Sequence, residues 1–214
     1  MPRSLWFCIT ICTAVLCILT VLIICEVPVP GDMAMVNWAV SRRNEPFTVF
    51  IEGLTFVSSA IPGLIITGVV SLVELWRRKR FDLRAGWATM AYLGAVACNI
   101  GLRILVGRQR PSVSYIPHVL PELQMGFQRF CYPSGHAGTA LVAFSSLIVL
   151  AWALPRLRWV ALAAGVLVIL CCGYGRVYMG VHWPTDVLAG YLLGTSWLAI
   201  GLLIRQYKNS GGIP

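Results

Sequence analysis

The segment Leu5–Cys25 reads LWFCITICTAVLCILTVLIIC and contains no charged residue over 21 consecutive positions. A helix rising about 1.5 Å per residue needs about 20 apolar residues to cross a hydrocarbon core of ~30 Å. This stretch is longer than the roughly 7–15 apolar residues of a signal peptide, and no clear A-x-A-like cleavage site follows it. We therefore interpret Leu5–Cys25 as a retained first membrane span.

Five further apolar runs follow along the chain. They cover Phe47–Trp76, which is interrupted by Pro62, and then Ala85–Val106, Ala137–Leu154, Trp159–Tyr174 and Val187–Ile204. None of them alternates polar and apolar residues as the strands of a membrane β-barrel do. The sequence therefore predicts an all-α polytopic membrane protein, with six transmembrane helices in a single domain over residues 1–214.

The composition agrees with a membrane protein. Of the 214 residues, 58% are hydrophobic and only 12% are charged, whereas soluble domains carry about 25% charged residues. This excludes the soluble globular, disordered and collagen-like classes. The net charge of +9 then points to a membrane rather than to nucleic acid. The eight cysteines include no CxxC pair and no zinc-ligand spacing, so we expect neither a disulfide framework nor a zinc site.

Positively charged residues gather on one side of the six-span layout. They are Arg3, Arg77, Arg78, Lys79, Arg80, Arg84, Arg156, Arg158, Arg205 and Lys208. Cytoplasmic loops carry an excess of Lys and Arg. We therefore expect this side and both termini to be cytoplasmic, with the loops 26–46, 107–136 and 175–186 outside.

Two further features leave alternatives open. Asp32 is placed to cap a short interfacial helix that ends before Arg42 and Arg43, but a plain connecting loop fits 26–46 equally well. Gly190 and Gly194 form a small-xxx-small pair in the last span, for which close helix packing is the better explanation than dimerisation.

The first of three polar clusters on the outer side is RILVGRQRP, residues 103–111. Seven residues make nearly two helical turns, so Arg103 and Arg110 are expected on one face at the outer end of the third span. Pro111 is expected to end that helix. On its own, this cluster is explained by arginines that snorkel at a helix end.

The second cluster is CYPSGH, residues 131–136, directly before the fourth span. We expect Ser134 to cap the following helix, and the free N–H groups at such a helix start, next to Gly135, can bind an anion. A lone histidine at the position of His136 is more often an ordinary interfacial residue.

The third cluster is GRVYMGVHWPTD, residues 175–186. Pro184 suits the first turn of the last span, which places His182 just outside the helix and Asp186 just inside it. Asp186 is then able to orient the His182 imidazole. An acidic residue at a helix N-terminus is, by itself, also a plain partner of the helix dipole.

Together the clusters indicate more than each does alone. All three begin or end a span on the same side of the membrane, and they combine three arginines, two histidines, one carboxylate and a helix N-terminus. Such a set of groups is suited to binding a tetrahedral oxyanion and transferring it.

The clusters resemble the motifs of the type 2 phosphatidic acid phosphatase (PAP2) superfamily, which read K-x6-R-P, P-S-G-H and S-R-x5-H-x3-D. The spacing fits in all three motifs, and six spans match the membrane branch of the family and its helical bundle. Two positions differ from the pattern, since Arg103 stands in place of the usual lysine and Gly175 in place of the serine. Arg103 keeps the charge but is bulkier and forked, so the phosphate geometry is expected to differ.

The resemblance implies a role for each residue of the clusters. His182 is the nucleophile that forms a phosphohistidine, Asp186 orients it, and His136 is the general acid and then the base. The residues implied to bind the phosphoryl oxygens are Arg103, Arg110, Ser134, Gly135 and Arg176. Since three cations neutralise the transferring group, the resemblance implies no metal and no cofactor.

The implied substrate is a phosphorylated lipid reached from the bilayer: undecaprenyl diphosphate, phosphatidylglycerol phosphate, phosphatidate or a lipid A phosphate. We expect a bacterial cytoplasmic membrane, an extracytoplasmic active site and no nucleic-acid partner, while the sequence leaves the oligomeric state open. Two alternatives remain. One is a phosphotransferase that passes the phosphoryl group to an acceptor other than water, and the other is a non-enzymatic transporter or scaffold.

Overall fold

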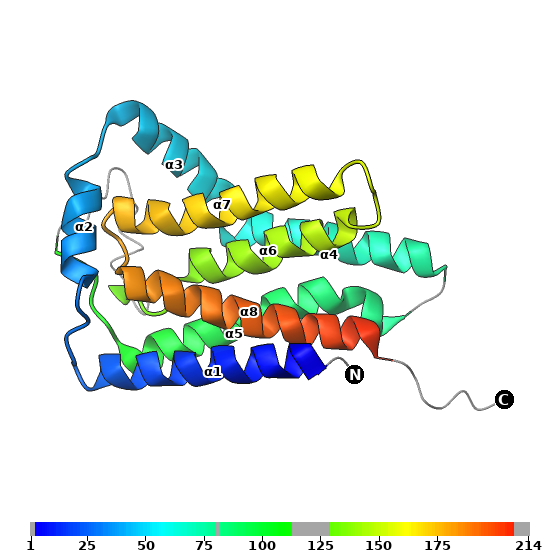
Figure 1. Ribbon diagram of the computed structural model, residues 1–214, viewed down its shortest axis with the longest axis horizontal. Coiled ribbons are helices and arrows are strands. Elements are labelled where there is room, and N and C mark those ends of the chain that lie inside the picture. Colours follow the sequence, from blue (N-terminus) through cyan, green and yellow to red (C-terminus); the bar gives the residue numbers. More distant parts are fainter. Residues whose placement is uncertain (1–2, 80–81, 113–128, 208–214) are drawn as a thin grey trace.

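The computed structural model describes residues 3–79, 82–112 and 129–207, which form helices and connecting loops without a β-strand (Figure 1). The elements are α1 (Arg3–Ile24), α2 (Asp32–Val40), α3 (Glu45–Val57), α4 (Ala60–Arg78), the short 3₁₀ turn η1 (Leu83–Gly86), α5 (Trp87–Val106), α6 (Gly135–Ala151), α7 (Arg158–Tyr178) and α8 (Pro184–Gln206). The predicted all-α fold is confirmed.

Five described segments are long and apolar enough to cross a membrane. They are Arg3–Ile24, Ala60–Arg78, Leu83–Val106, Arg158–Tyr178 and Pro184–Gln206. The helix Gly135–Ala151 is equally apolar in character but has only 17 residues. The chain is therefore an integral membrane protein, and a count of six full spans stays a prediction.

The expectation of one span over Phe47–Trp76 is wrong. The chain breaks at Ser58 and Ser59, where α3 ends and α4 begins. The Ser58 hydroxyl donates to the carbonyl of Leu54 at 2.6 Å and satisfies the end of α3. Pro62 lies in the first turn of α4, where its missing N–H costs no helical hydrogen bond. As a result α3 packs on α7, while α4 packs on α5 and α6.

Helix α8 lies at the centre of the bundle and packs against α1, α5 and α6. At its crossing with α6, a Cβ on Gly138 would come within 2.9 Å of the Gly190 carbonyl oxygen, and one on Gly194 within 2.7 Å of that of Gly138. Only glycine permits this approach of two backbones. The pair Gly190 and Gly194 therefore serves packing within the chain, and it brings the start of α6 against the start of α8.

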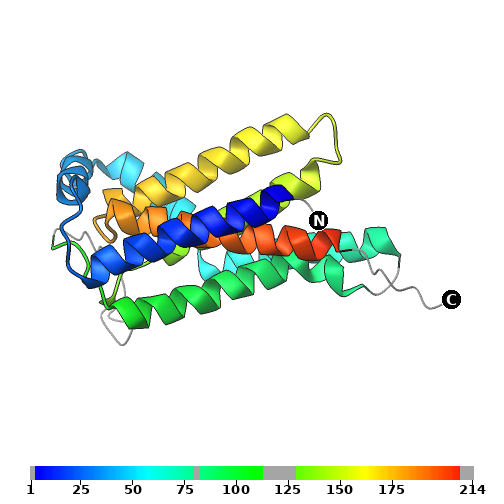
Figure 2. The same ribbon diagram turned by 60° about the horizontal axis from the view of Figure 1, so that its bottom comes forward.

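The two ends of the bundle are formed by different chain segments (Figures 1 and 2). The described N-terminal end of α1 and the C-terminal ends of α4 and α8 lie at one end, together with the turn between α6 and α7. The described members of the predicted cytoplasmic cation set lie in or next to these segments, except Arg84, which lies in η1, while Arg80 and Lys208 lie outside the described residues. At the opposite end, α5 and α7 finish and α6 and α8 begin, and α2 crosses over them.

Of the two readings of residues 26–46, the helical one is correct, since Asp32–Val40 is α2. The expected cap is wrong, however. The N-cap position is Gly31, with φ of 90°, and Asp32 is the first helical residue. Its carboxylate is directed to the start of α8 instead, where it accepts a hydrogen bond from the Thr185 N–H at 3.1 Å.

Candidate active site

The three polar clusters meet at the end of the bundle that α2 covers. The connection between α7 and α8 shows how the third cluster is built. The N–H groups of Val181 and His182 donate to the Arg176 carbonyl at 3.1 and 3.3 Å, and Pro184 begins α8. His182 therefore lies just outside α8 and Asp186 just inside it, as predicted.

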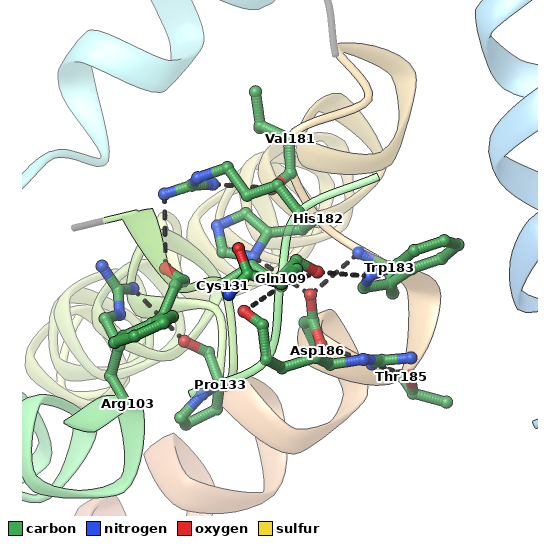
Figure 3. A network of polar contacts seen from close by, with 12 residues as sticks. Arg103, Gln109, Cys131, Pro133, Val181, His182, Trp183, Thr185 and Asp186 are labelled. Carbon is green, nitrogen blue, oxygen red and sulfur yellow. Dashed lines mark hydrogen bonds and ion pairs between the residues drawn. The ribbon is translucent and has the colours of Figure 1, made fainter. Parts of the chain in front are cut away.

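His182 and Asp186 face each other (Figure 3). The His182 Nδ1 atom lies 3.4 Å from Asp186 Oδ2, which is somewhat long for a hydrogen bond. The same oxygen accepts the Trp183 N–H at 2.9 Å and is thereby fixed. Both side chains are buried, since His182 is 2% exposed and Asp186 is 0% exposed.

The burial of His182 decides its protonation state. Its pKa is lowered to about 3, chiefly by loss of hydration and in part by Arg110 and Arg103, while Asp186 acts in the opposite direction. The imidazole is therefore neutral near pH 7. With Asp186 next to Nδ1, the proton is placed on that nitrogen and the lone pair on Nε2.

The turn before α6 is held by α8. The Ser134 N–H donates to the Asp186 carbonyl at 2.8 Å. The expectation that Ser134 caps α6 with its side chain is wrong, because Ser134 occupies the N-cap position without a side-chain hydrogen bond. Its backbone is fixed by α8, and its buried hydroxyl has no hydrogen-bond partner among the described residues. The first amides of α6 therefore lack the expected side-chain cap and stay available to an anion.

Arg103 approaches the same turn from α5. Its Nη2 donates to the Pro133 carbonyl at 3.3 Å, and Asn99, one helical turn earlier, donates to the same oxygen at 3.1 Å. A Cβ on Gly135 would lie 3.4 Å from the Arg103 guanidinium, so the missing side chain lets the two groups approach. The Nε atom of Arg103 is buried and has no described partner.

The expectation that Arg103 and Arg110 share a helix face is wrong. Helix α5 ends at Val106, and Gly107, with φ of 63°, turns the chain before Pro111 is reached. Arg110 instead reaches the site from the loop, where it donates to the carbonyls of Val181 at 2.6 Å and Phe130 at 3.5 Å. Burial lowers the pKa of Arg110. Both arginines still act electrostatically on His182.

Arg176 lies at the end of α7 and is 7% exposed. Its Nη2 donates to the Thr55 hydroxyl at 2.6 Å and contacts the Met179 sulfur at 3.3 Å. It forms no ion pair with a described carboxylate, and its Nε has no described partner. Arg103, Arg110, Arg176 and His182 all act electrostatically on the half-buried His136 imidazole. The structure thus brings together all eight residues that the three clusters predicted.

Sequence reasoning missed Arg108, which belongs to the first cluster but received no role there. Its Nη1 donates to Asp186 Oδ1 at 2.6 Å and to the Thr185 hydroxyl at 2.7 Å, while Nη2 donates to Asp32 Oδ2 at 2.7 Å. Burial opposes the charge on Arg108, but Asp186 and Asp32 outweigh it and raise the pKa of Arg108. The sequence did contain a signal for Arg108, because it is a second arginine close to Arg110 in the motif at the end of the third span.

The other loop residues do not join the described site. Arg129 is exposed and lies over the Phe130 ring at 4.7 Å. His118 and Glu122 lie outside the described residues.

One group of side chains has the composition of a metal site. The ligand atoms of Cys131, His182 and Asp186 lie within 4.8 Å of one another. The group fits a cation poorly, because Arg108 and the Trp183 N–H occupy the Asp186 oxygens and the Cys131 thiol donates to the Gln109 carbonyl at 3.2 Å. Burial also raises the pKa of Cys131, so the thiolate that a metal needs is disfavoured.

Comparison with known proteins gives a consistent result. Residues 84–210 match the family model of the PAP2 superfamily. The undecaprenyl-diphosphatase of Sulfolobus acidocaldarius is 40% identical over 84 residues, which are 39% of this chain and 36% of that protein. The chain thus aligns with little more than a third of that relative. Phosphatidylglycerophosphatase B of Bacillus subtilis is 27% identical over 185 residues, with 84% of each chain covered.

A solved structure shares the fold. It is described as the first transmembrane PAP2 type phosphatidylglycerolphosphate phosphatase from Bacillus subtilis, and it superposes with a TM-score of 0.74 at 21% identity. The match covers 92% of this chain and 98% of that chain.

Proposed function

The chain belongs to the PAP2 superfamily, and from this premise and the site geometry we propose that it is a membrane lipid phosphatase. It hydrolyses a phosphomonoester or diphosphate of a lipid through a phosphohistidine intermediate and needs no metal or cofactor. The observation that carries this proposal is the state of the donors around His182. Arg103, Arg176 and Ser134 each keep a buried donor atom without a described partner.

Buried donors without partners are costly, and although single ones also occur on Arg78 and Arg205, their gathering around His182 implies a ligand that satisfies them. The charges restrict its nature, because Arg103 and Arg176 form no ion pair with a described carboxylate. A phosphoryl group supplies both the negative charge and the acceptor oxygens. The phosphate-binding set that we propose is Arg103, Arg110, Ser134, Gly135 and Arg176.

In the first chemical step, the Nε2 lone pair of neutral His182 attacks phosphorus and the P–N bond forms. The bond between phosphorus and the leaving oxygen breaks, and that oxygen takes a proton from His136, which enters the step as the imidazolium because the bound phosphoryl anion favours its charged form. Asp186 holds the Nδ1 proton and stabilises the positive charge that develops on the imidazole. The arginines stabilise the negative charge of the transferring group.

In the second step, a water molecule attacks phosphorus and the P–N bond breaks. His136, which lost its proton in the first step, now accepts one from this water. Inorganic phosphate leaves and both histidines return to their initial state. No step needs a cation beyond the arginines of the chain.

The names of the relatives suggest which lipids to test. An undecaprenyl-diphosphatase and a phosphatidylglycerophosphatase are similar to this chain, so we include undecaprenyl diphosphate and phosphatidylglycerol phosphate among the substrates, with phosphatidate and lipid A phosphates beside them. The site lies at the ends of helices that are long enough to span a membrane. Lipid head groups lie at the same depth as such helix ends.

We further propose that the site faces the extracytoplasmic side of a bacterial cytoplasmic membrane and that both termini are cytoplasmic, because the arginine-rich end of the bundle lies opposite to the site. In a cysteine-free background, a cysteine at position 112 should react with an impermeant thiol reagent in intact cells. A cysteine at position 79 should not. The reverse pattern would place the site in the cytosol.

The central experiment measures release of inorganic phosphate from these lipids in detergent, together with trapping of the phosphoenzyme. His182→Ala should abolish both turnover and phosphoenzyme. His136→Ala should be slow but should accumulate phosphoenzyme from a substrate with a good leaving group, because the water-activating base is missing. Samples are quenched in alkaline denaturant, where the P–N bond survives.

Three outcomes contradict parts of the proposal. Phosphate on residue 136 in the His182→Ala protein would reverse the two roles. A phosphorylated acceptor in place of free phosphate would assign a phosphotransferase. The absence of turnover on every lipid would favour a non-enzymatic membrane protein.

A further inference from the structure

Asp32 lies far from the three clusters in sequence, yet it is part of their surroundings in the fold. It begins α2, is 6% exposed, and accepts hydrogen bonds from three donors of other segments. These donors are the Thr185 N–H at 3.1 Å, the Thr185 hydroxyl at 2.6 Å and Arg108 Nη2 at 2.7 Å. Every polar contact of this carboxylate is therefore directed at the site.

Arg108 connects this carboxylate to Asp186. Its two terminal nitrogens divide between the acids, with Nη2 on Asp32 at 2.7 Å and Nη1 on Asp186 Oδ1 at 2.6 Å. The planar guanidinium fork thereby fixes the direction of both carboxylates. Asp186 is left with Oδ2, the oxygen that faces His182.

The charges of the three groups act on His182 in addition to those of Arg103 and Arg110. Arg108 and Asp186 alone would form a neutral pair, and a neutral pair stabilises a positive imidazole only weakly. With Asp32 the trio has two negative charges and one positive charge, so its net charge is −1. The trio is largely buried, with side-chain exposures of 7% for Asp32, 17% for Arg108 and 0% for Asp186, so water screens this charge poorly.

We propose that Asp32 is a positioning residue for the nucleophile, acting through Arg108 to orient Asp186 and to give the trio the negative charge that stabilises phosphorylated His182. The inference rests on the proposed phosphatase function. It assigns to α2 a direct part in the reaction, although α2 lies outside the three motifs and outside the residues that match the family.

The competing explanation is that the trio only attaches α2 to the bundle. The two explanations differ in their effect on the intermediate. Loss of negative charge near His182 slows formation of the P–N bond and destabilises the product of that step, so less phosphoenzyme is present per folded molecule. A purely structural role changes the number of folded molecules but not the phosphoenzyme fraction of each.

The test variant is Asp32→Asn, which keeps the shape of the side chain and removes its charge. The matched control is Glu26→Gln, which removes an exposed carboxylate from the adjoining segment. For each protein, sites that bind orthovanadate are counted by calorimetric titration, and kcat, KM and the alkaline-quenched phosphoenzyme are expressed per such site. The substrate is the lipid phosphate that the wild-type protein turns over fastest.

We expect Asp32→Asn to lower kcat per site by about tenfold or more, which corresponds to about 1.4 kcal/mol in the barrier. The phosphoenzyme fraction should fall with it, and KM and vanadate affinity should change less than about threefold, because the phosphate-binding arginines are untouched. Glu26→Gln should behave as the wild type. Arg108→Lys keeps the net charge of the trio, so its phosphoenzyme fraction should remain closer to that of the wild type than that of Asp32→Asn.

Several results would overturn the inference. In one, the kcat and phosphoenzyme per site of Asp32→Asn match those of Glu26→Gln. In another, Asp32→Asn and Arg108→Lys both lose their vanadate sites, which would assign the trio to folding. A wild-type protein without any turnover would overturn the proposed function and this inference with it, whereas a wild-type-like Asp32→Asn overturns this inference alone.

Discussion

Both ends of the helical bundle are rich in arginine, but they use it differently. At the end away from the site, each described arginine near an acid is paired with it. Arg205 lies 2.9 Å from Glu74, Arg78 lies 3.0 Å from Asp82, and Arg84 lies 2.7 Å from Asp82. These pairs connect α4, η1 and α8, and their arginines are partly exposed.

At the site, Arg176 is buried and Arg103 is half-buried, and both donate only to neutral oxygen or sulfur atoms among the described residues. Among the described residues there, Arg108 is neutralised by two carboxylates, Asp32 and Asp186. The two ends therefore show two structural roles of arginine that can be told apart. A paired arginine at a helix end stabilises the arrangement of helices, whereas a buried arginine without a counter-charge indicates an anion that binds later.

The largest expected effect separates the two ends directly. Arg176→Gln should lower kcat by about 10²–10³-fold, because it removes a donor that acts on the charge of the transferring group. Arg205→Gln, the matched change at the other end, should leave kcat within about threefold of the wild type. Phosphate release from detergent-solubilised protein checks both. Equal losses in the two variants would show that the comparison does not separate catalysis from stability.

The second effect is on stability. Glu74→Gln leaves Arg205 without its counter-charge and should lower the free energy of unfolding by about 1–3 kcal/mol, because Glu74 is only 5% exposed. Vanadate affinity should not change, since the site is at the opposite end. Thermal unfolding in detergent measures the shift, with Glu45→Gln as an exposed acidic control. An unchanged melting temperature would mean that these ion pairs make no measurable contribution to stability, which is the case for many surface ion pairs.

The motifs predicted which residues the fold brings close together, for a physical reason. Span boundaries follow from hydropathy, and once Arg103, His136 and Asp186 are placed at span ends on one side, the membrane itself brings them to one level. Pro184 also predicted the start of α8 correctly, which fixed the relation between His182 and Asp186.

The parts that sequence reasoning could not give depend on contacts between distant segments. The break at Ser58 separates α3, which packs on α7, from α4, which packs on α5 and α6, and no hydropathy window detects it. The end of α5 at Gly107 overrode the simple spacing argument for Arg110. Asp32 matched the local sequence pattern of a helix cap, but its hydrogen-bond partners lie 76 residues and 153 residues away along the chain.

A smaller effect uses pH to act on one end only. The folded-state pKa of His182, about 3, is below the value near 6.5 of an unfolded histidine. The unfolded chain therefore binds the extra proton first as the pH falls from about 6.5 towards 3, and stability decreases by up to about 1.4 kcal/mol per pH unit. At the other end, the hydrogen bond from Arg84 lowers the pKa of Asp82, so that pair persists to stronger acid.

Melting curves between pH 7 and pH 4 measure this dependence. His182→Asn should show a shallower loss of melting temperature on acidification than the wild-type protein, because it removes one buried neutral imidazole. A steeper or identical slope would mean that His182 is not the group that binds the proton on unfolding.

The smallest expected effect is that of a chelator. At the site, the arginines supply the positive charge that neutralises the transferring phosphoryl group. Excess EDTA should therefore leave kcat unchanged. Cys131, His182 and Asp186 are the described residues most able to contradict this, since their ligand atoms lie within 4.8 Å of one another. Both oxygens of Asp186 are engaged, however, at 2.6 Å by Arg108 and at 2.9 Å by the Trp183 N–H. A cation would have to displace these donors and enter a region that already holds several guanidinium groups.

Phosphate release with and without EDTA tests this prediction, and Cys131→Ser removes the preferred soft ligand as a second check. Activity that is lost with EDTA and restored by a divalent ion would show that the arginines alone do not supply the charge.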